Sequence, residues 1–291
     1  MYSDTLLNLF GKDMVTLYGI CIAIGVLCCV LVLFKFAKGK VEESFIDFLF
    51  YNGIVAIAIG FVSACLFQAI YAYIENPEAG FDLFNSGMTF IGGLIGGVAS
   101  FLVGYFVFRP ALKNRLVDII SLLPCCIVVA HAFGRIGCFF AGCCYGKPTN
   151  SFLGVKFPFL SYKVHPTQLY EAAFLFALFA VMLILYVKKG FKHNLSLYLL
   201  AYGIFRFLIE FVRGDERGSF VSGISPSQFW SILMVVASVG VYFLLELGYK
   251  LRAKELASKA EVKEVETIVD EPSKVETIVE EPSREVENEE N

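Results

Sequence analysis

Long apolar runs constrain this chain more than any other feature. Each run is close to the 20 or so residues that a helix needs to cross the hydrocarbon core of a bilayer. The chain is 57% hydrophobic, whereas soluble domains are about 45–50% apolar. We therefore expect an all-α, polytopic membrane protein with about seven transmembrane helices. The runs lie at about 14–34, 45–70, 88–108, 116–134, 167–187, 195–212 and 225–247.

The short loops predict the orientation. Lysine and arginine concentrate after the first, third, fifth and seventh runs, and the positive-inside rule assigns such loops to the cytoplasm. The N-terminus is therefore expected outside and the C-terminus in the cytoplasm. The loop at 135–166 is the exception, because alternation places it outside although it carries Arg135 and three lysines. Positive charge that opposes the topological bias indicates a function for this loop.

The C-terminal part of the chain has a different composition. From residue 255 it is strongly acidic, and Val265–Lys274 is repeated almost unchanged as Val275–Arg284. Acidic segments with so little apolar content are typical of disorder. We predict a membrane-embedded domain at 1–254 and a disordered, acidic cytoplasmic tail with a ten-residue repeat at 255–291. A docking role for the repeats stays open.

Nine cysteines divide into two groups. Six lie inside apolar runs, where cysteine behaves as a small hydrophobe. Cys138, Cys143 and Cys144 form a C-x4-C-C cluster in a glycine-rich stretch. Zinc sites usually need a second pair of ligands, so we predict no metal and no cofactor. A disulfide from Cys138 is a second possibility, and thiols that line a pocket are the interpretation we favour.

The stretch from His131 to Thr149 carries an arginine among glycines. A cation at membrane depth costs at least about 2.5–3.5 kcal/mol on insertion scales, and irregular backbone there must line a cavity or be buried in protein. We expect the apolar run to break into open backbone that binds an anion, such as a lipid phosphate, with Arg135. The alternative is an ordinary helix end whose arginine reaches the surface.

The sixth run carries a polar stripe. Tyr202, Arg206, Glu210 and Arg213 are three or four residues apart, which places them on one helix face. Glu210 can neutralise one arginine and leave the other for an anion. The alternative is a structural ion pair that only fixes helix packing.

The fifth run opens with His165-Pro-Thr-Gln-Leu-Tyr-Glu171. Proline suits the first helical position, so Gln168 and Glu171 are expected on one face of the first turns. His165 alone is more typical of a structural role than of a base. Among the glycines of the third run, Gly92 and Gly93 can let a helix or a lipid approach closely. Tyr18 lies at the start of the first run, and a tyrosine at a membrane interface is usually an anchor.

Taken in order, these motifs resemble the prolipoprotein diacylglyceryl transferase family. They are Tyr18-Gly19, Gly92-Gly-Leu-Ile-Gly-Gly97, Gly134-Arg-Ile-Gly137, His165–Glu171 and Phe207-Leu-Ile-Glu-Phe-Val-Arg213. The resemblance implies a multi-pass enzyme of the bacterial plasma membrane. It would transfer the diacylglyceryl group of phosphatidylglycerol to the lipobox cysteine of a prolipoprotein, in lipoprotein biosynthesis. Its partners would be that lipid, the prolipoprotein and the bilayer, with no nucleic acid.

The resemblance also implies residue roles. Arg135 and Arg213 would hold the lipid phosphate and stabilise the departing glycerol phosphate. The family usually has a histidine where this chain has Ile91, and two asparagines and a glutamate where it has Cys138, Ala141 and Cys143. The base is therefore missing, and either His131 or His165 could replace it. A thiol whose pKa the two arginines lower would need no base, and this route is the one we favour.

These arguments predict a site and leave alternatives open. The chain could be a divergent paralogue that uses another acceptor, or a non-catalytic lipid-binding membrane protein. The predicted catalytic residues are Arg135, Arg213 and His165. The predicted substrate-binding residues are Tyr18, Gly92, Gly93, Gly137, Cys138, Cys143, Gln168, Tyr170, Glu171, Arg206 and Glu210.

Overall fold

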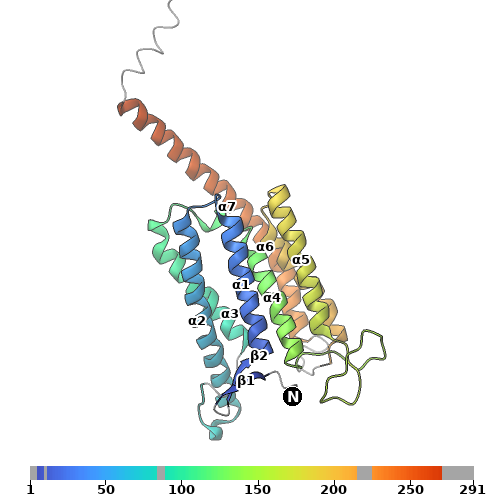
Figure 1. The fold of residues 1–291 in the computed structure, drawn as a ribbon. Coiled ribbons are helices and arrows are strands. Elements are labelled where there is room, and N and C mark those ends of the chain that lie inside the picture. The colour runs from blue at the N-terminus through green and yellow to red at the C-terminus, as the bar shows by residue number, and fades with distance from the viewer. Residues whose placement is uncertain (1–4, 10–11, 84–88, 215–224, 271–291) are drawn as a thin grey trace, which may run out of the picture. The chain divides into compact units, whose positions relative to one another are not determined.

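The structure, a computed structural model, describes residues 5–9, 12–83, 89–214 and 225–270. By its internal contacts the chain divides into two units, residues 1–239 and 240–291. The main elements are β1 (Thr5–Leu9), β2 (Lys12–Thr16), α1 (Leu17–Ala37), α2 (Glu43–Glu75), α3 (Phe90–Phe108), α4 (Leu123–Phe140), α5 (Thr167–Lys189), α6 (Asn194–Ile209) and α7 (Pro226–Asp270) (Figure 1). Short 3-10 turns are η1 (Pro77–Ala79), η2 (Arg109–Ala111), η3 (Leu116–Asp118) and η4 (Glu210–Val212).

The helices confirm a polytopic membrane protein. Among the described residues, 6 helices are long and apolar enough to cross a membrane, and α3 contributes a shorter apolar stretch, Gly92–Phe108. Each predicted run overlaps one of α1 to α7. The strands β1 and β2 form one antiparallel pair before α1, which is a small departure from the expected all-α fold.

The fourth helix differs from its prediction. The run was expected at 116–134 with a break around Arg135, but α4 spans Leu123–Phe140 and holds Arg135 inside the helix. Pro124 lies in the first turn of α4, where a missing N–H is tolerated, and this delays the start of the helix. The expected irregular backbone begins only after α4, where Gly142 has φ 64°.

Close packing explains why glycines do not break α4. A methyl group on Gly137 would lie 3.0 Å from Cδ2 of Tyr18 and 3.4 Å from Cβ of Cys21. The glycine therefore lets α1 and α4 approach closely, and the tertiary contact offsets the low helix propensity of glycine. In Figure 1 these two helices lie side by side, with α5 on the other side of α4.

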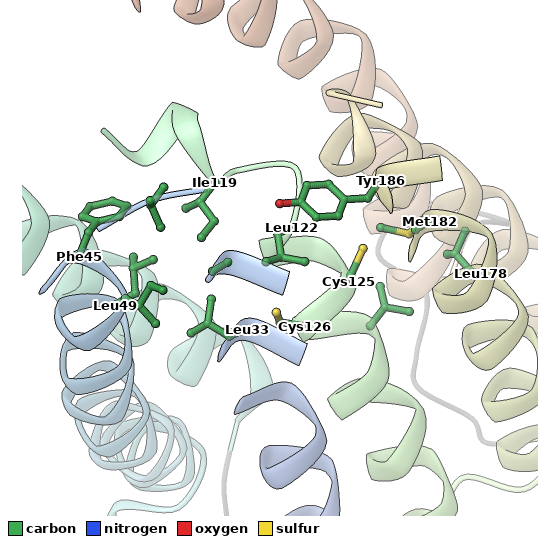
Figure 2. Packing of buried hydrophobic residues seen from close by; sticks show 14 of the residues in the cluster. Leu33, Phe45, Leu49, Ile119, Leu122, Cys125, Cys126, Leu178, Met182 and Tyr186 are labelled. Atoms are coloured by element: carbon green, nitrogen blue, oxygen red, sulfur yellow. The ribbon is translucent and has the colours of Figure 1, made fainter. Parts of the chain in front are cut away.

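A buried apolar cluster joins α1 to α6 of the first unit. Figure 2 shows side chains of α1, α2, α4 and α5 meeting around α4. Cys125 and Cys126 are 0% and 3% exposed within this cluster, so these two cysteines act as small apolar residues, as predicted. Other members include Leu33, Phe45, Leu49, Ile119, Leu122, Leu178, Met182 and Tyr186.

Loops that should share one side of the membrane meet at one end of the first unit. Lys113 Nζ lies 2.6 Å from a carboxylate oxygen of Glu42, which joins the loops after α1 and α3. Ser121 Oγ donates a hydrogen bond to the carbonyl of Lys192 beyond α5, at 3.1 Å. The loop before α5 lies at the opposite end of that helix. The side of the membrane that each end faces stays a prediction.

The helix in the second unit extends past residue 255, where the disordered tail was predicted to begin. The helix α7 continues to Asp270, so residues 255–270 are helical and not disordered as predicted. Glu255 pairs with Arg252 and with Lys259, each at 2.9 Å. Ion pairs at these spacings stabilise an exposed helix, and no proline occurs between Pro226 and Pro272. The predicted disorder of residues 271–291 concerns a part of the chain outside the described residues.

Candidate functional site

A buried ionic group joins α4, α5 and α6. Nε of Arg135 lies 3.0 Å from Oε1 of Glu171, a side chain that is 1% exposed. The hydroxyl of Tyr202 donates to the same oxygen at 2.6 Å. Nε2 of His131 lies 3.9 Å from it, and the hydroxyl of Tyr198 lies 3.4 Å from Nδ1 of that histidine. The guanidinium is therefore held in place by groups from three helices.

Helical spacing brings these groups together. His131 and Arg135 are four residues apart on α4, and Tyr198 and Tyr202 are four apart on α6, so each pair shares a helix face. The two tyrosine rings stack with centroids 5.7 Å apart. Glu171 is buried in the second turn of α5. It neutralises Arg135 at low dielectric, as a buried charge requires.

A second ionic group lies at the end of α6. Nη1 of Arg206 is 3.0 Å from Oε2 of Glu210, and Nε of Arg213 is 3.8 Å from the same oxygen. Arg206 also donates to Oγ of Ser227 at 2.9 Å, and Ser225 donates to Glu210 at 3.0 Å. Among the described residues, the two groups together contain three arginines and two glutamates.

Arg213 does not lie on the predicted helix face. The helix α6 ends at Ile209, and η4 carries the chain to Arg213, whose φ and ψ are −70° and 148°. The turn still brings the arginine to Glu210, because its amide donates to the Glu210 carbonyl at 3.2 Å. The structure therefore brings Arg206, Glu210 and Arg213 together as predicted, but the helix is not continuous to Arg213. Tyr202, the fourth residue of the predicted stripe, belongs to the first ionic group.

The loop between α4 and α5 is fastened beside Arg213. The amide of Gly146 donates to the carbonyl of His165 at 2.8 Å, and the amide of Lys147 donates to the carbonyl of Val212 at 2.8 Å. Gly146 and Arg213 form an antiparallel bridge. This bridge joins the segment after α4 to the start of α5 and the end of α6, so one glycine organises three parts of the site.

Replacing Gly146 by alanine is expected to loosen this bridge. The new methyl group would lie 2.6 Å from the Val212 carbonyl oxygen and 2.9 Å from Cβ of His165, and overpacking of this kind costs about 1–3 kcal/mol. Thermal unfolding in detergent and limited proteolysis of the loop would measure the effect. Gly53→Ala is the matched control, since no atom lies within 4 Å of the added methyl group. Equal stability of the two variants would contradict the prediction.

Side chains at the start of α5 form hydrogen bonds with the backbone of the cysteine loop. The helix begins at Thr167, one residue after the predicted position, with Pro166 as its N-cap. Thr167 donates its hydroxyl to the Cys144 carbonyl at 2.7 Å, and Gln168 donates its amide to the Cys143 carbonyl at 2.5 Å. Oε1 of Gln168 is buried and has no hydrogen-bond partner among the described residues. This oxygen can therefore accept a hydrogen bond from a ligand.

The three cysteines of the loop form one thiol cluster. All nine cysteines of the chain are thiols in the structure, and the predicted alternative of a disulfide from Cys138 is not what it contains. Side-chain hydrogen bonds join Cys138, Cys143 and Cys144 to one another, and a further one joins Cys144 to Arg213. No group of three or more His, Cys, Asp or Glu side chains in the described part of the chain could hold a metal ion.

The environments of Cys143 and Cys144 shift their acidities in opposite directions. Hydrogen bonds from the Cys138 and Cys143 thiols, with a further contribution from the Arg213 charge, hold the pKa of Cys144 below its ordinary value. Hydrogen bonds and burial among the same thiols raise the pKa of Cys143. Cys144 is therefore the most acidic of the three thiols.

Other predicted residues lie around these groups or apart from them. His165 and Tyr170 pair with each other, with the Tyr170 hydroxyl 3.3 Å from Nδ1 of His165, whereas the histidine within the ionic group is His131. Gly92 and Gly93 pack against α2, where Ser63 donates to the Gly92 carbonyl at 2.8 Å. The close neighbours of Gly92 and Gly93 are residues of α2, and their role in substrate binding stays a prediction.

Four further residues of the site were missed. Cys144 was counted in the cluster without a role, and Tyr198, Ser225 and Ser227 were not singled out. The position of Tyr198, four residues before Tyr202, is a helical spacing that could have revealed it. Nothing in the sequence pattern reveals the two serines, because Ser227 reaches Arg206 and Ser225 reaches Glu210 only through the fold.

Comparison with known proteins identifies the family. The sequence model of prolipoprotein diacylglyceryl transferase matches residues 4–244. The chain belongs to the prolipoprotein diacylglyceryl transferase family. A curated relative from Clostridium tetani, named phosphatidylglycerol–prolipoprotein diacylglyceryl transferase, is 37% identical over 247 residues, covering 81% of this chain and 95% of the relative. A second from Clostridium perfringens, named as number 2 of that enzyme, is 32% identical and covers 82% and 94%.

The family match extends across both ionic groups. It ends at residue 244, so it contains α1 to α6, the loop between α4 and α5, and the first part of α7. The chain also covers 80% of a relative of the same name from a Marinomonas species, at 32% identity. The residues that interact in the site therefore belong to the region that is similar to the family.

Proposed function

We propose that this protein transfers the diacylglyceryl group of phosphatidylglycerol to the lipobox cysteine thiol of prolipoproteins in the bacterial plasma membrane. The observation that carries the proposal is the pair of ionic groups that hold Arg135, Arg206 and Arg213 beside Glu171 and Glu210 inside an apolar helix bundle. Intramembrane charges are functional by default. The relatives are named for this reaction, and their similarity covers the whole site.

The reaction needs a place for a lipid phosphate. In the transfer, the acceptor sulfur forms a bond to the glycerol carbon of the diacylglyceryl group. The bond between that carbon and the phosphate oxygen breaks, and its electron pair leaves with glycerol phosphate. Arginine forks bind phosphate oxygens in a bidentate manner and stabilise the charge that develops on them. Arg135 and Arg213 are the groups that we assign to this role, with Arg206 beside them.

The glutamates orient these arginines. Glu171 holds Nε of Arg135 at 3.0 Å, and Glu210 lies 3.0 Å from Arg206 and 3.8 Å from Arg213. Arg213 is thus further from the shared carboxylate than Arg206 is. This difference makes Arg213 the more available of the two for a phosphate that replaces Cys144 as its partner. The amide of Gln168 and its buried oxygen border the same loop.

The proton of the acceptor thiol must also leave. Ile91 lies in the first turn of α3, at the position where the family usually has a histidine. We infer that the nearby arginines lower the pKa of the acceptor thiol and that no protein base is essential. His131 is the strongest alternative base, because it lies 3.9 Å from the glutamate that holds Arg135.

Replacing either histidine is expected to leave measurable transfer. General bases contribute about 100- to 10,000-fold to rates, whereas a residue that only packs should cost less than about tenfold. His131→Ala and His165→Gln should therefore each stay within about tenfold of the parent rate. Diacylglyceryl transfer to a lipobox peptide by purified protein is the measurement. Abolition by one histidine change would establish general-base catalysis by that residue.

Complementation tests the function itself. The protein should restore growth to a bacterial strain depleted of its own transferase, and mass spectrometry should find diacylglyceryl on the cysteine of a reporter lipoprotein. A strain that carries an empty vector is the control. If the protein is present in the membrane but modifies no lipobox cysteine, the proposed function is wrong. The protein would then use a different acceptor or bind lipid without catalysis.

A further inference from the structure

The thiol cluster is built by the backbone after α4. The amide of Cys143 donates to the carbonyl of Cys138 at 3.2 Å, and the Cys143 thiol lies 3.6 Å from the same oxygen. This turn folds the chain back on the end of α4. Cys144 follows in the left-handed region, with φ 61°, a conformation that costs free energy in a residue other than glycine. The hydrogen bond from Thr167 fixes its carbonyl.

The turn presents one thiol to an arginine. Cys144 forms side-chain hydrogen bonds with Arg213 and with the two other thiols, and Arg213 is only 5% exposed. A thiolate beside a guanidinium reacts faster with electrophiles than an ordinary thiol does. Two further thiols within hydrogen-bonding distance give any oxidised form of Cys144 an immediate partner.

We propose that Cys144 is a site of reversible oxidation by hydroperoxides and that Cys138 is the thiol that closes the resulting disulfide. In the first step the Cys144 sulfur attacks one peroxide oxygen, the O–O bond breaks, and sulfenic acid and water or an alcohol form. In the second step the Cys138 sulfur attacks the Cys144 sulfur, the S–O bond breaks, and water leaves. One peroxide is reduced to the level of water, and two thiols are oxidised to one disulfide.

Backbone geometry selects Cys138 over Cys143 as the partner. Cys143 and Cys144 are adjacent, and consecutive Cα atoms are about 3.8 Å apart across a trans peptide bond. Disulfides usually join residues whose Cα atoms are about 4.4–6.8 Å apart. Cys138 lies on the last turn of α4, and its thiol forms a side-chain hydrogen bond with the Cys144 thiol. Because these two residues are not adjacent in the sequence, this constraint does not apply to them.

The disulfide would change the surroundings of two arginines. Oxidation removes the Cys144 thiol group that faces Arg213, and it ties the loop to α4 at a position three residues after Arg135. We expect diacylglyceryl transfer to fall at least about tenfold in the oxidised protein and to recover on reduction. This expectation of lost transfer rests on the proposed function, whereas the chemistry at Cys144 does not.

Mass spectrometry of the full chain in membranes tests the chemistry. The protein is treated with hydrogen peroxide, its remaining thiols are blocked with N-ethylmaleimide, and chymotrypsin then cleaves after Phe139, Phe140 and Tyr145. This digestion separates Cys138 from the peptide that holds both Cys143 and Cys144. A cross-linked pair of peptides is expected, and dithiothreitol should release it. A dimedone probe should label Cys144 about tenfold faster than Cys28.

Variants distinguish the three thiols. Cys143→Ser should keep the cross-link, Cys144→Ser should abolish it, and Cys138→Ser should let sulfenic acid accumulate on Cys144. Labelling of Cys144 should persist as the pH falls below the ordinary range of thiol ionisation, because the lowered pKa keeps the thiolate. A cross-link between Cys138 and Cys143 that survives in Cys144→Ser would overturn the proposal, as would equal labelling of Cys144 and Cys28 in the parent protein.

The activity measurement is separate from these readouts. If the cross-link forms and reverses without any change in the rate of transfer, Cys144 is an oxidation site but its oxidation does not regulate the enzyme. A protein that forms the cross-link but transfers no lipid when reduced would reject the proposed function alone. Absence of any cross-link in the parent protein would reject the inference whatever the activity.

Discussion

Arg135→Lys and Arg213→Lys are each expected to reduce diacylglyceryl transfer about 100- to 1000-fold, the cost of removing one donor that stabilises a developing oxyanion. Lysine keeps the charge but cannot reproduce the planar fork of arginine. The fork of Arg135 is used in the structure, because Nε binds Glu171 and a further hydrogen bond reaches Tyr202. Rates of transfer to a lipobox peptide, measured with the purified protein, give the loss directly.

The matched control is Arg109→Lys. Arg109 is exposed and lies in η2, at the other end of the first unit, so its replacement should leave the rate within about twofold of the parent, because surface positions contribute little. A transfer rate equal to that of the parent in either Arg135→Lys or Arg213→Lys would remove the assigned phosphate role. Thermal unfolding of all three variants separates lost chemistry from lost folding.

Glu171→Gln is expected to destabilise the protein and to abolish most transfer. Glu171 is 1% exposed and is the ion-pair partner of Arg135, and removing one member of a buried pair costs about 3–5 kcal/mol. Glutamine keeps the size of the side chain and can still accept from Tyr202, so the change isolates the charge. Thermal unfolding in detergent, followed in parallel with transfer, measures both effects.

Glu42→Gln is the control for Glu171→Gln. Glu42 forms an exposed ion pair with Lys113, and surface pairs contribute about 0–1 kcal/mol. The double variant Arg135→Met with Glu171→Gln removes both buried charges. It should regain stability relative to Glu171→Gln but should not regain transfer. A single variant Glu171→Gln as stable as Glu42→Gln would show that the buried pair does not need its carboxylate.

The membrane helices were predictable because one physical property decides them. An apolar run near 20 residues long must become a helix in a bilayer, whatever its neighbours are. The end of α4 was not predictable, because glycine at 134 and 137 suggests a break in isolation. Packing of Gly137 against Tyr18 keeps the helix continuous past these glycines. This contact joins residues far apart in the sequence, so no local pattern predicts it.

The site was predictable in part for a similar reason. Spacings of three and four residues placed Arg206 with Glu210, because both lie within or next to one helix. The pairing of Arg135 with Glu171 joins α4 to α5, and that of Cys144 with Arg213 joins a loop to the end of α6. No local pattern encodes such pairs, so the sequence could nominate the charged residues but could not state their partners.

The backbone bridge between Gly146 and Arg213 couples the position of the loop between α4 and α5 to the position of the Arg213 backbone. Any ligand that draws the backbone at Arg213 toward itself also pulls on the segment at 141–147, and a peptide that displaces this segment moves the arginine. Such coupling is reciprocal by thermodynamic necessity. Occupation of the phosphate position and arrival of a thiol-bearing peptide should therefore change each other's affinity by the same factor, whichever of the two binds first.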